Sequence, residues 1–497
     1  MSKYILGFNL DTKGARASIY DQESKLIGTG YEAYPSYYPQ EGWVEQDANE
    51  IYVAAKDAAA QAFKASELEP TDIAAIGIAN QRDTAVFWDK ETGQPVCPAI
   101  VWQDRRSVKI SDRLGMLGGK DLVRRTGMAI MPNATATKIA WVLENNKEIK
   151  ESMKAGKVLY GTVDSWVVWK LTGKSVHVTD HSNNSVTLLQ DAETLDYDKE
   201  LLKSLRIPSE ILPKICKSSE VYGTTDKDEF FGAEVPIAGI VGDQQARALG
   251  LGVLHEGTVQ NTYGVGSFII MNTGSKYIAP SEGVFSPVYY SVKDRTNFCM
   301  EGKADVSTSV FDWLRDKLGI VSGIEEAEEM AREVENNGGV YFVPAFVGLG
   351  TPYNDPYARA TIFGLSRSAD KRHIARAALE SMAFQVYDAV SRLERRSGTK
   401  ITHLRADGEG AKSDFMLQFQ ADILGVSVER SAIEDSASLG AAYMAGLAVG
   451  YWDSIEQVSK RWKVEKSFEP IMSDKERQDQ VAMWTKAIGR ASGWLRR

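Results

Sequence analysis

Apolar and polar positions along the chain repeat with two periods, one typical of strands and one typical of helices. Short apolar runs predict strands at 4–8, 17–20, 73–79, 85–88, 237–241, 258–263, 268–272, 340–343 and 401–405. Longer amphipathic runs predict helices at 50–64, 137–145, 164–171, 244–251, 324–336, 370–395, 412–423, 438–449 and 474–494. Strands and helices alternate along the whole chain, which predicts an α/β fold.

Two segments, 4–20 and 258–272, share one pattern: a strand, a polar turn that contains Gly, and a second strand. Such a turn can present backbone N–H groups to a phosphate, because glycine has no Cβ to prevent close approach. The repeat fits two similar lobes that hold a nucleotide between them, divided near residue 253, with a mixed sheet in each lobe beginning at its hairpin. Two unrelated hairpins fit the spacing equally well.

Length and composition exclude several classes of protein. A chain of 497 residues predicts two or three domains. With 43% hydrophobic and 25% charged residues it is not disordered, and its net charge of −9 argues against nucleic-acid or membrane partners. Cys97, Cys216 and Cys299 form no CxxC pair, which predicts neither a zinc site nor a disulfide framework. We expect a cytoplasmic protein with no secretory signal, and a buried helix at the apolar stretch 441–452.

A candidate general base lies at Asp243, where a predicted buried strand ends and a helix begins. A carboxylate at this point can take the proton of an attacking hydroxyl, and neighbouring Gln244 can bind a second hydroxyl. An Asp at a strand–helix junction also suits a helix N-cap. Both interpretations are open from the residues alone.

A second polar turn follows the predicted strand 73–79 and contains Arg82 and Asp83. A donor beside an acceptor suits a small polyhydroxylated ligand, whose hydroxyls both donate and accept hydrogen bonds, although a surface ion pair has the same sequence pattern. Trp102 precedes a charged helix start and is either a wall for the carbon chain of a ligand or part of the core. The chain has neither a GxxxxGK[ST] loop nor a GxGxxG turn, so P-loop and Rossmann nucleotide binding are not predicted.

Ordered motifs cover most of the chain, among them NQRDT at 80–84, AIVWQDRR at 99–106, GDQQA at 242–246 and NTYGVGSF at 261–268. Further motifs lie at 39–47, 161–173, 179–185, 339–359, 419–430 and 439–452. Together they resemble the FGGY carbohydrate kinase family over essentially the whole chain, and most of all its members that phosphorylate glycerol.

The resemblance implies a two-lobed fold of the actin and heat-shock ATPase type, with a ribonuclease-H-like sheet in each lobe and a cleft between them. It implies residues 1–253 as the lobe on the polyol side and 254–497 as the lobe on the nucleotide side. ATP and Mg²⁺ are the implied cofactors, and the reaction is transfer of the γ-phosphoryl group to a primary hydroxyl of glycerol or another small polyol or sugar. A homodimer and a homotetramer are the candidate assemblies.

The resemblance also assigns roles to single residues. Asp243 matches the general base. The substrate-binding set is Arg82, Asp83, Trp102, Asp243, Gln244 and Phe268. The nucleotide-binding set is Thr12, Lys13, Arg16, Gly264, Val265, Gly408, Glu409 and Ser413. The metal-binding residues are Asn9 and Asp243.

Several positions depart from the family pattern on the nucleotide side. In the first phosphate turn, an alignment without gaps puts Asn9 at a magnesium-side Asp and Asp11 at a Gly, whereas a two-residue deletion keeps Asp11 in the Asp role and shortens the turn. Val265 stands where the family has Thr, and Glu409 where it has Gly. On the adenosine side, Ser413 replaces an Asn.

Two positions on the polyol side also differ, with Asp83 in place of Glu and Asn133 in place of Tyr. A carboxylate about 4 Å from a phosphate oxygen costs about 4 kcal/mol at an effective dielectric constant near 20. We therefore expect weakened binding of ATP–Mg²⁺ beside a usable polyol pocket, with Lys13 as either a compensating charge or an exposed turn residue. The alternative function is a catalytically impaired paralogue that acts in ligand binding, regulation or partner interaction.

Overall fold

The computed structural model describes residues 3–281 and 283–496. Its strands are β1 (Tyr4–Leu10), β2 (Gly14–Tyr20), β3 (Leu26–Ala33), β4 (Glu45–Gln46), β5 (Ile73–Asn80), β6 (Val86–Asp89), β7 (Ala99–Ile100), β8 (Val158–Gly161), β9 (Val178–Asp180), β10 (Lys214–Cys216), β11 (Ser219–Thr224), β12 (Pro236–Gly242), β13 (Thr258–Tyr263), β14 (Ser267–Asn272), β15 (Val288–Val292), β16 (Arg295–Ala304), β17 (Tyr341–Val343), β18 (Thr361–Phe363), β19 (His403–Asp407), β20 (Ser427–Ser431) and β21 (Val464–Phe468).

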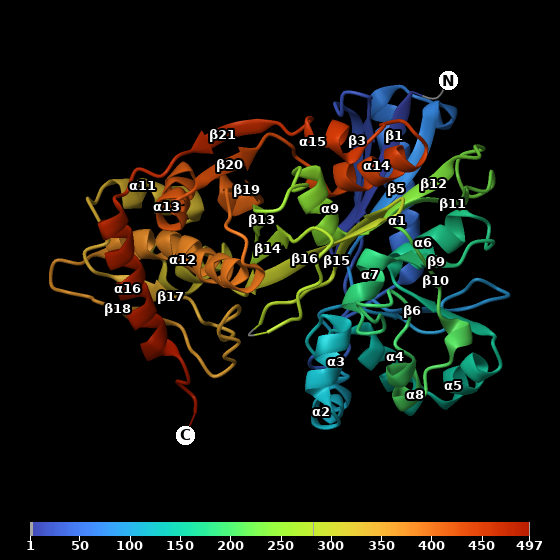
Figure 1. Ribbon diagram of the computed structural model, residues 1–497, viewed down its shortest axis with the longest axis horizontal. Coiled ribbons are helices and arrows are strands. Elements are labelled where there is room, and N and C mark those ends of the chain that lie inside the picture. The colour runs from blue at the N-terminus through green and yellow to red at the C-terminus, as the bar shows by residue number, and fades with distance from the viewer. Residues whose placement is uncertain (1–2, 282, 497) are drawn as a thin grey trace.

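Helices pack around the strands, and a group of them lies at the lower right of the molecule (Figure 1). The helices are α1 (Ala48–Ser66), α2 (Val108–Met116), α3 (Gly119–Thr126), α4 (Thr135–Asn145), α5 (Lys147–Lys154), α6 (Val163–Leu171), α7 (His181–Val186), α8 (Lys199–Leu205), α9 (Asp243–Gly250), α10 (Ser309–Trp313), α11 (Ile324–Arg332), α12 (Lys371–Ser397), α13 (Asp414–Leu424), α14 (Ser436–Ala448), α15 (Ile455–Ser459) and α16 (Asp474–Ala491). No helix among the described residues is long and apolar enough to cross a membrane.

The two halves of the chain repeat one strand arrangement. In the first half β1 and β2 form an antiparallel hairpin, and β1 lies parallel to β5, which lies parallel to β12. In the second half β13 and β14 form the hairpin, and β13 lies parallel to β19, which lies parallel to β20. The expected two-lobed α/β fold is therefore confirmed, and the two hairpins occupy equivalent places in the two halves.

The expectation of a separate sheet in each lobe is wrong. One strand order, β21-β20-β19-β13-β14-β16-β15-β11-β12-β5-β1-β2-β3, connects both hairpins. The long strand β16 makes this connection, because it pairs with β14 over 299–304 and with β15 over 295–298. A single backbone pair, Ser219 with Val292, then joins β15 to β11 of the first half.

Helix α14 returns the chain to the first half, where it packs on β1, β5 and β12. A Cβ on Gly7 would collide with the Ser438 carbonyl oxygen, and one on Gly77 with the Ala441 carbonyl oxygen, so the helix backbone lies directly on the strands. In Figure 1, α14 and α15 lie beside β1 and β3 although they are coloured red. A cut at residue 253 therefore does not separate the halves in space, and that boundary stays a prediction.

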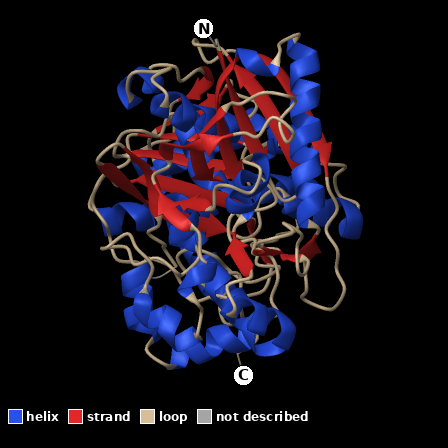
Figure 2. Cartoon of the chain, turned by 90° about the vertical axis from the view of Figure 1, so that its right-hand side faces the viewer, coloured by secondary structure: helices blue, strands red, loops and turns tan. Residues whose placement is uncertain are grey.

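A helix-rich region lies below the strands of the first half and includes α2 to α5 and α8 (Figures 1 and 2). Its own apolar cluster contains buried Ile139, Met153 and Tyr160, separate from the cluster behind β1 and β5. The parallel strands β1, β5 and β12 have their carboxyl ends at one edge of the sheet, where ligands of open α/β sheets bind. This edge faces the second half, and Arg82, Asp83 and Asp243 follow the ends of β5 and β12 there.

Candidate active site

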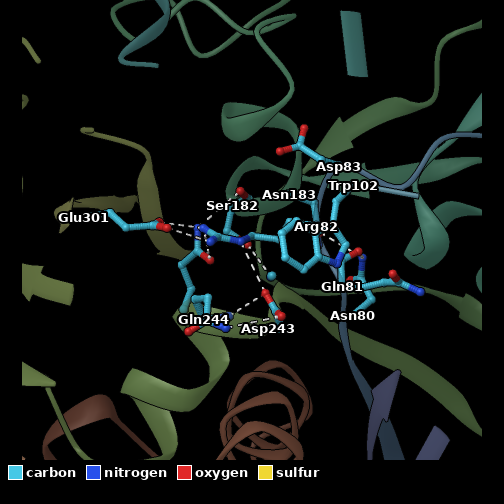
Figure 3. A network of polar contacts seen from close by, with 12 residues as sticks. Asn80, Gln81, Arg82, Asp83, Trp102, Ser182, Asn183, Asp243, Gln244 and Glu301 are labelled. Atoms are coloured by element: carbon cyan, nitrogen blue, oxygen red, sulfur yellow. Dashed lines mark hydrogen bonds and ion pairs between the residues drawn. The ribbon is translucent and has the colours of Figure 1, made fainter. Parts of the chain in front are cut away.

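Two neighbouring strand ends bring the first pair of site residues together. Strands β5 and β12 are parallel with Gly242 opposite Asn80, so the residues that follow each strand meet at the same edge. Arg82 and Asp243 follow these ends, and the Arg82 Nε lies 3.3 Å from the Asp243 Oδ1 (Figure 3). The predicted convergence of these two residues is therefore present in the structure.

Asp243 begins α9 and does not cap it. The N-cap is Gly242, which makes no side-chain cap. Among the described residues, the Asp243 Oδ1 accepts a hydrogen bond only from the backbone N of the next residue, Gln244, at 2.8 Å. The N-cap interpretation is therefore wrong, because the carboxylate is aimed at Arg82. Burial raises the pKa of Asp243 above its ordinary value, although Arg82 and Arg247 oppose the shift. A raised pKa makes this carboxylate a better proton acceptor.

The Arg82 guanidinium connects the two halves. Its Nη1 and Nη2 donate to the Glu301 carboxylate at 2.7 and 2.8 Å, and Nη1 also donates to the Gln245 Oε1 at 3.1 Å. Glu301 comes from β16 and is 7% exposed. The sequence reading missed it, although a carboxylate after the apolar run 298–300 signals a buried charge that needs a distant partner.

Asp83 turns away from this cluster. It has a positive φ of 65°, and its Oδ1 accepts from the Thr135 hydroxyl at 3.1 Å while Asn133 Nδ2 lies 3.4 Å from Oδ2. Figure 3 shows the carboxylate directed away from Asp243 and Gln244. Burial raises the pKa of Asp83 to about 6, even though Lys138 lowers it. The predicted substrate set is thus divided, with Asp83 beside Asn133 rather than beside Asp243.

A buried lysine that the sequence reading missed holds the Asp83 turn. Lys138 on α4 is 0% exposed, and its Nζ donates to the Asp83 backbone oxygen at 2.6 Å. Burial lowers the pKa of Lys138 to about 8, while Asp83 and Asp104 oppose this shift. An ammonium donor on a backbone carbonyl stabilises the unusual left-handed backbone of Asp83.

The proposed apolar walls are both half-buried. The Trp102 backbone N donates to the Thr84 hydroxyl at 3.3 Å, and its indole N–H donates to the Thr12 hydroxyl at 2.8 Å. Thr12, predicted on the nucleotide side, therefore lies against the predicted polyol wall. Phe268 on β14 lies opposite Lys303 of β16. The Gln244 Oε1 is buried with no hydrogen-bond partner in the part of the chain that the structure describes, and is available to a ligand.

A buried network of hydrogen bonds holds the ends of β5 and β12 in place. The Gly242 backbone N donates to the Ser182 hydroxyl at 2.9 Å, and the Asn80 Nδ2 donates to the Asn183 Oδ1 at 3.0 Å. Asp180 accepts from both Ser182 and Asn183, at 2.7 and 2.9 Å. These hydrogen bonds hold the residues that follow the strands in place.

The first phosphate turn is short and closed. Strand β1 ends at Leu10, and the Asp11 Oδ1 accepts from the backbone N of Lys13 at 2.7 Å and of Gly14 at 3.1 Å. Lys13 is exposed and forms no ion pair with any described residue. Both alignments of this turn stay predictions. The N–H groups of Lys13 and Gly14 are used within the turn, and not directed outward.

Asn9 lies inside β1 opposite Arg16, and it is 4% exposed. Its Nδ2 lies 3.4 Å from the Asp435 Oδ1, and Arg16 Nε lies 3.9 Å from the Asp435 Oδ2. Arg16 shares that partner, and therefore lies at the start of α14. The metal-binding role of Asn9 stays a prediction.

The second phosphate turn and the adenosine-side turn lie against each other. A Cβ on Gly408, which has a φ of 89°, would lie 2.6 Å from the Tyr263 carbonyl oxygen at the end of β13. The backbone oxygens of Gly264 and Val265 accept from the backbone N of Thr308 and Ser307, at 2.9 and 2.8 Å. The Val265 side chain is 65% exposed.

Glu409 follows Gly408 and is exposed, so its carboxylate can turn into solvent. The Ser413 hydroxyl accepts from the Met416 backbone N at 3.1 Å and caps α13. Its role as a nucleotide contact stays a prediction, as do those of Gly264, Val265, Gly408 and Glu409.

The residues present fit a magnesium ion that arrives with a nucleotide. No group of three or more His, Cys, Asp or Glu side chains that could hold a metal occurs among the residues described. Mg²⁺ in kinases needs only one or two carboxylates, with phosphate oxygens and water completing its shell. Asp243 satisfies this need, because its Oδ2 has only the long 3.4 Å contact with Gln244 Nε2.

Comparison with known proteins identifies the family of the chain. The N-terminal domain of the FGGY family of carbohydrate kinases matches residues 4–250, and its C-terminal domain matches residues 259–449. The glycerol kinase of Petrotoga mobilis is 46% identical over 496 residues, covering 100% of this chain and 99% of its own. Glycerol kinase 2 of Thermotoga maritima is 44% identical over 496 residues, covering 100% of both chains.

Solved structures show the same fold. The structure of Plasmodium falciparum glycerol kinase with ADP superposes with a TM-score of 0.93 at 32% identity, covering 98% of both chains. A gluconate kinase from Lactobacillus acidophilus superposes with a TM-score of 0.88 at 24% identity, which concerns the fold alone, again over 98% of both chains. Both domain matches, the full-length identities and the strand-end site together establish that the chain belongs to the FGGY family of carbohydrate kinases.

Proposed function

We propose that this carbohydrate kinase transfers the γ-phosphoryl group of ATP to a primary hydroxyl of glycerol or another small polyol or sugar. The observation that carries the proposal is the Arg82–Asp243 pair, with its nitrogen and oxygen 3.3 Å apart, beside the unpartnered Gln244 Oε1. A donor, a carboxylate and an amide acceptor at one strand edge suit a ligand with several hydroxyls. The glycerol kinases at 44% and 46% identity support glycerol as the first acceptor to test.

In this mechanism Asp243 accepts the proton of the attacking hydroxyl. Its raised pKa makes proton transfer more favourable, and Arg82 keeps the carboxylate oriented. Arg82 and Gln244 hold the other hydroxyls, so that one primary hydroxyl faces the phosphoryl donor. Bound Mg²⁺ would supply charge neutralisation on the phosphate oxygens, with Asp243 as a carboxylate that can hold it.

The alternative of a catalytically impaired paralogue has no support from the comparisons, whose full-length relatives are kinases. The altered phosphate turns remain the motivation for measuring nucleotide affinity.

The proposal has three further parts: assembly as a homodimer or homotetramer, a cytoplasmic location and the use of Mg²⁺. Gel filtration with light scattering tests the oligomeric state, and activity measured over a range of Mg²⁺ concentrations tests the use of the metal.

The decisive experiment measures glycerol-dependent ADP release by the purified protein, with erythritol, xylulose and gluconate as competing acceptors. Asp243→Asn removes the proton acceptor and keeps the shape of the side chain, so we expect kcat to fall about 10²-fold or more with little change in Tm. Asp294→Asn, at a fully exposed carboxylate, is the control and should leave kcat unchanged. Activity that survives in Asp243→Asn would assign the base elsewhere, and inactivity of the natural protein on every acceptor would reject the function.

A further inference from the structure

Arg247 lies one helical turn after Asp243, a spacing that puts both side chains on one face of α9. Its side chain is 23% exposed, and its Nη1 lies 3.8 Å from the Asp407 Oδ2 at the end of β19. The Arg247 guanidinium therefore lies between the candidate base of the first half and a strand end of the second half.

The guanidinium has donors without acceptors. Arg247 makes no side-chain hydrogen bond to any residue that the structure describes, and its ion pair with Asp407 is longer than a hydrogen bond. Asp407 is already satisfied, because it accepts from the Thr262 hydroxyl at 2.5 Å and from the Ser436 hydroxyl at 2.8 Å. A guanidinium carries five N–H donors, so Arg247 can bind an additional oxyanion.

The surrounding charges keep Arg247 protonated. Burial lowers its pKa, but the carboxylates of Asp407, Asp243, Asp435 and Asp11 together outweigh burial and raise the pKa above its ordinary value. The same residues come from the ends of separate strands and from the start of α14. Arg247 is thus a positive charge among carboxylates that come from both halves of the chain.

The first phosphate turn has few donors left for a phosphate group. Asp11 occupies the backbone N–H groups of Lys13 and Gly14, and Lys13 points to solvent. These groups are not available to phosphate oxygens. A cation four residues after the candidate base can supply the missing contact, because phosphoryl transfer depends on positioning and charge neutralisation.

We propose that Arg247 donates hydrogen bonds to the non-bridging oxygens of the transferred phosphoryl group; this rests on the proposed function. An oxygen lone pair of the acceptor hydroxyl forms a bond to the γ-phosphorus as the bond from that phosphorus to the bridging oxygen breaks. The electron pair of the broken bond leaves on ADP, and the hydroxyl proton passes to Asp243. Arg247 keeps all its protons and neutralises charge on the oxygens throughout.

The test compares Arg247→Ala and Arg247→Lys with the natural protein by calorimetric titration of ATP, ADP and AMP. We expect Arg247→Ala to bind ATP about tenfold more weakly, with AMP unchanged, because AMP lacks the γ-phosphate. We expect its kcat to fall about 10²-fold or more, and guanidinium ion added to the solution to restore part of it. Arg247→Lys should recover part of the ATP affinity, since it keeps the charge and loses the fork.

The control is Arg113→Ala, which removes an exposed arginine paired with Glu144 and should change neither affinity nor kcat. Equal weakening of ATP and AMP, or unchanged ATP affinity with unchanged kcat, would overturn the proposal and leave Arg247 as a partner of Asp407. If Arg247→Ala does not fold, as judged by Tm, Arg247→Lys and Arg247→Gln decide the same comparison. The affinity difference between ATP and AMP is independent of the acceptor, so it tests Arg247 even if no polyol is phosphorylated.

Discussion

Glu301 accepts two hydrogen bonds from the Arg82 guanidinium, at 2.7 and 2.8 Å, although the two residues are 219 positions apart in the chain. Arg82 follows β5 in the first half, and Glu301 lies on β16, where it pairs with Ile270 of β14 in the hairpin of the second half. A bidentate pair fixes both the position and the plane of the guanidinium. The orientation of a proposed substrate-binding arginine is therefore set by the opposite half of the molecule.

Glu301→Gln tests this dependence. The substitution keeps one acceptor oxygen but removes the charge, so the Arg82 guanidinium loses its fixed plane and is drawn to Asp243. We expect the KM for glycerol to rise about tenfold or more and kcat to fall, because small misplacements in a site are costly. We also expect a loss of stability of about 1–3 kcal/mol. Steady-state kinetics and thermal unfolding measure both effects.

Glu429→Gln is the matched control for that loss of charge. Glu429 pairs with Arg405 at 3.2 Å, a partly buried pair outside the described site. Loss of the Glu429 charge should lower Tm without changing the KM for glycerol. Equal effects of the two substitutions on KM would contradict a positioning role for Glu301.

The contribution of Asp164 to the stability of the protein should fall as the pH rises from about 4 to 7. Burial raises the pKa of Asp164, which is 0% exposed, from 3.8 to about 7. The folded state therefore holds a proton that the unfolded state releases. The resulting stability is fully present below pH 3.8 and is lost as the pH passes through 7, with at most about 1.4 kcal/mol per pH unit for one proton.

Chemical denaturation at a series of pH values measures this decline. Asp164→Asn cannot titrate and should flatten the curve, while Asp294→Asn, at an exposed carboxylate, should leave it unchanged. Part of the decline remains in Asp164→Asn, because burial also raises the pKa values of Asp83 and Asp388 to about 6. An unchanged slope in Asp164→Asn would show that this carboxyl is ionised in the folded protein throughout the range.

Two helical glycines should respond in opposite ways to the same substitution. A Cβ on Gly440 of α14 would collide with the Ala246 carbonyl oxygen of α9, whereas one on Gly489 of α16 meets no atom within 4 Å. Gly440→Ala should therefore cost about 1–3 kcal/mol or more, since the helices must move apart. Gly489→Ala should stabilise the protein by about 0.5–1 kcal/mol through helix propensity. Thermal unfolding of both variants decides, and a stable Gly440→Ala would contradict the close contact of α14 with α9.

Removing the Glu409 charge should strengthen nucleotide binding. Two charges 4 Å apart interact by about 1 kcal/mol in water, and Glu409 is exposed, so we expect a gain in ATP affinity of about fivefold in Glu409→Gly. Glu409→Gln keeps the bulk and should give most of the gain if charge is the cause. Adenosine, which has no phosphate, serves as the control ligand in the same titrations. A gain for adenosine as large as for ATP would assign the effect to bulk.

Local patterns in the sequence were enough to predict the α/β class and most of the long elements. The helix predicted at 370–395 is α12 at Lys371–Ser397, and the strand predicted at 73–79 is β5 at Ile73–Asn80. Asp243 was also recognisable as a candidate base, since its place after a buried strand follows from the pattern on both sides. The periodicity of apolar positions shows which residues lie on the same face of one helix or strand. The fold class, the long elements and the place of Asp243 depend mainly on this local information.

Only the tertiary structure decided which distant residues meet. Three contacts join segments far apart in the chain. They are the Arg82–Glu301 pair, the hydrogen bond from Lys138 to the Asp83 backbone oxygen and the packing of α14 on the first half. Strand β16 joins the two halves into one strand order for the same reason, because pairing between strands is absent from local periodicity. Arg247 lies at a helical position with no local sign of function, and its charge acquires a role only where the carboxylates from separate strand ends surround it.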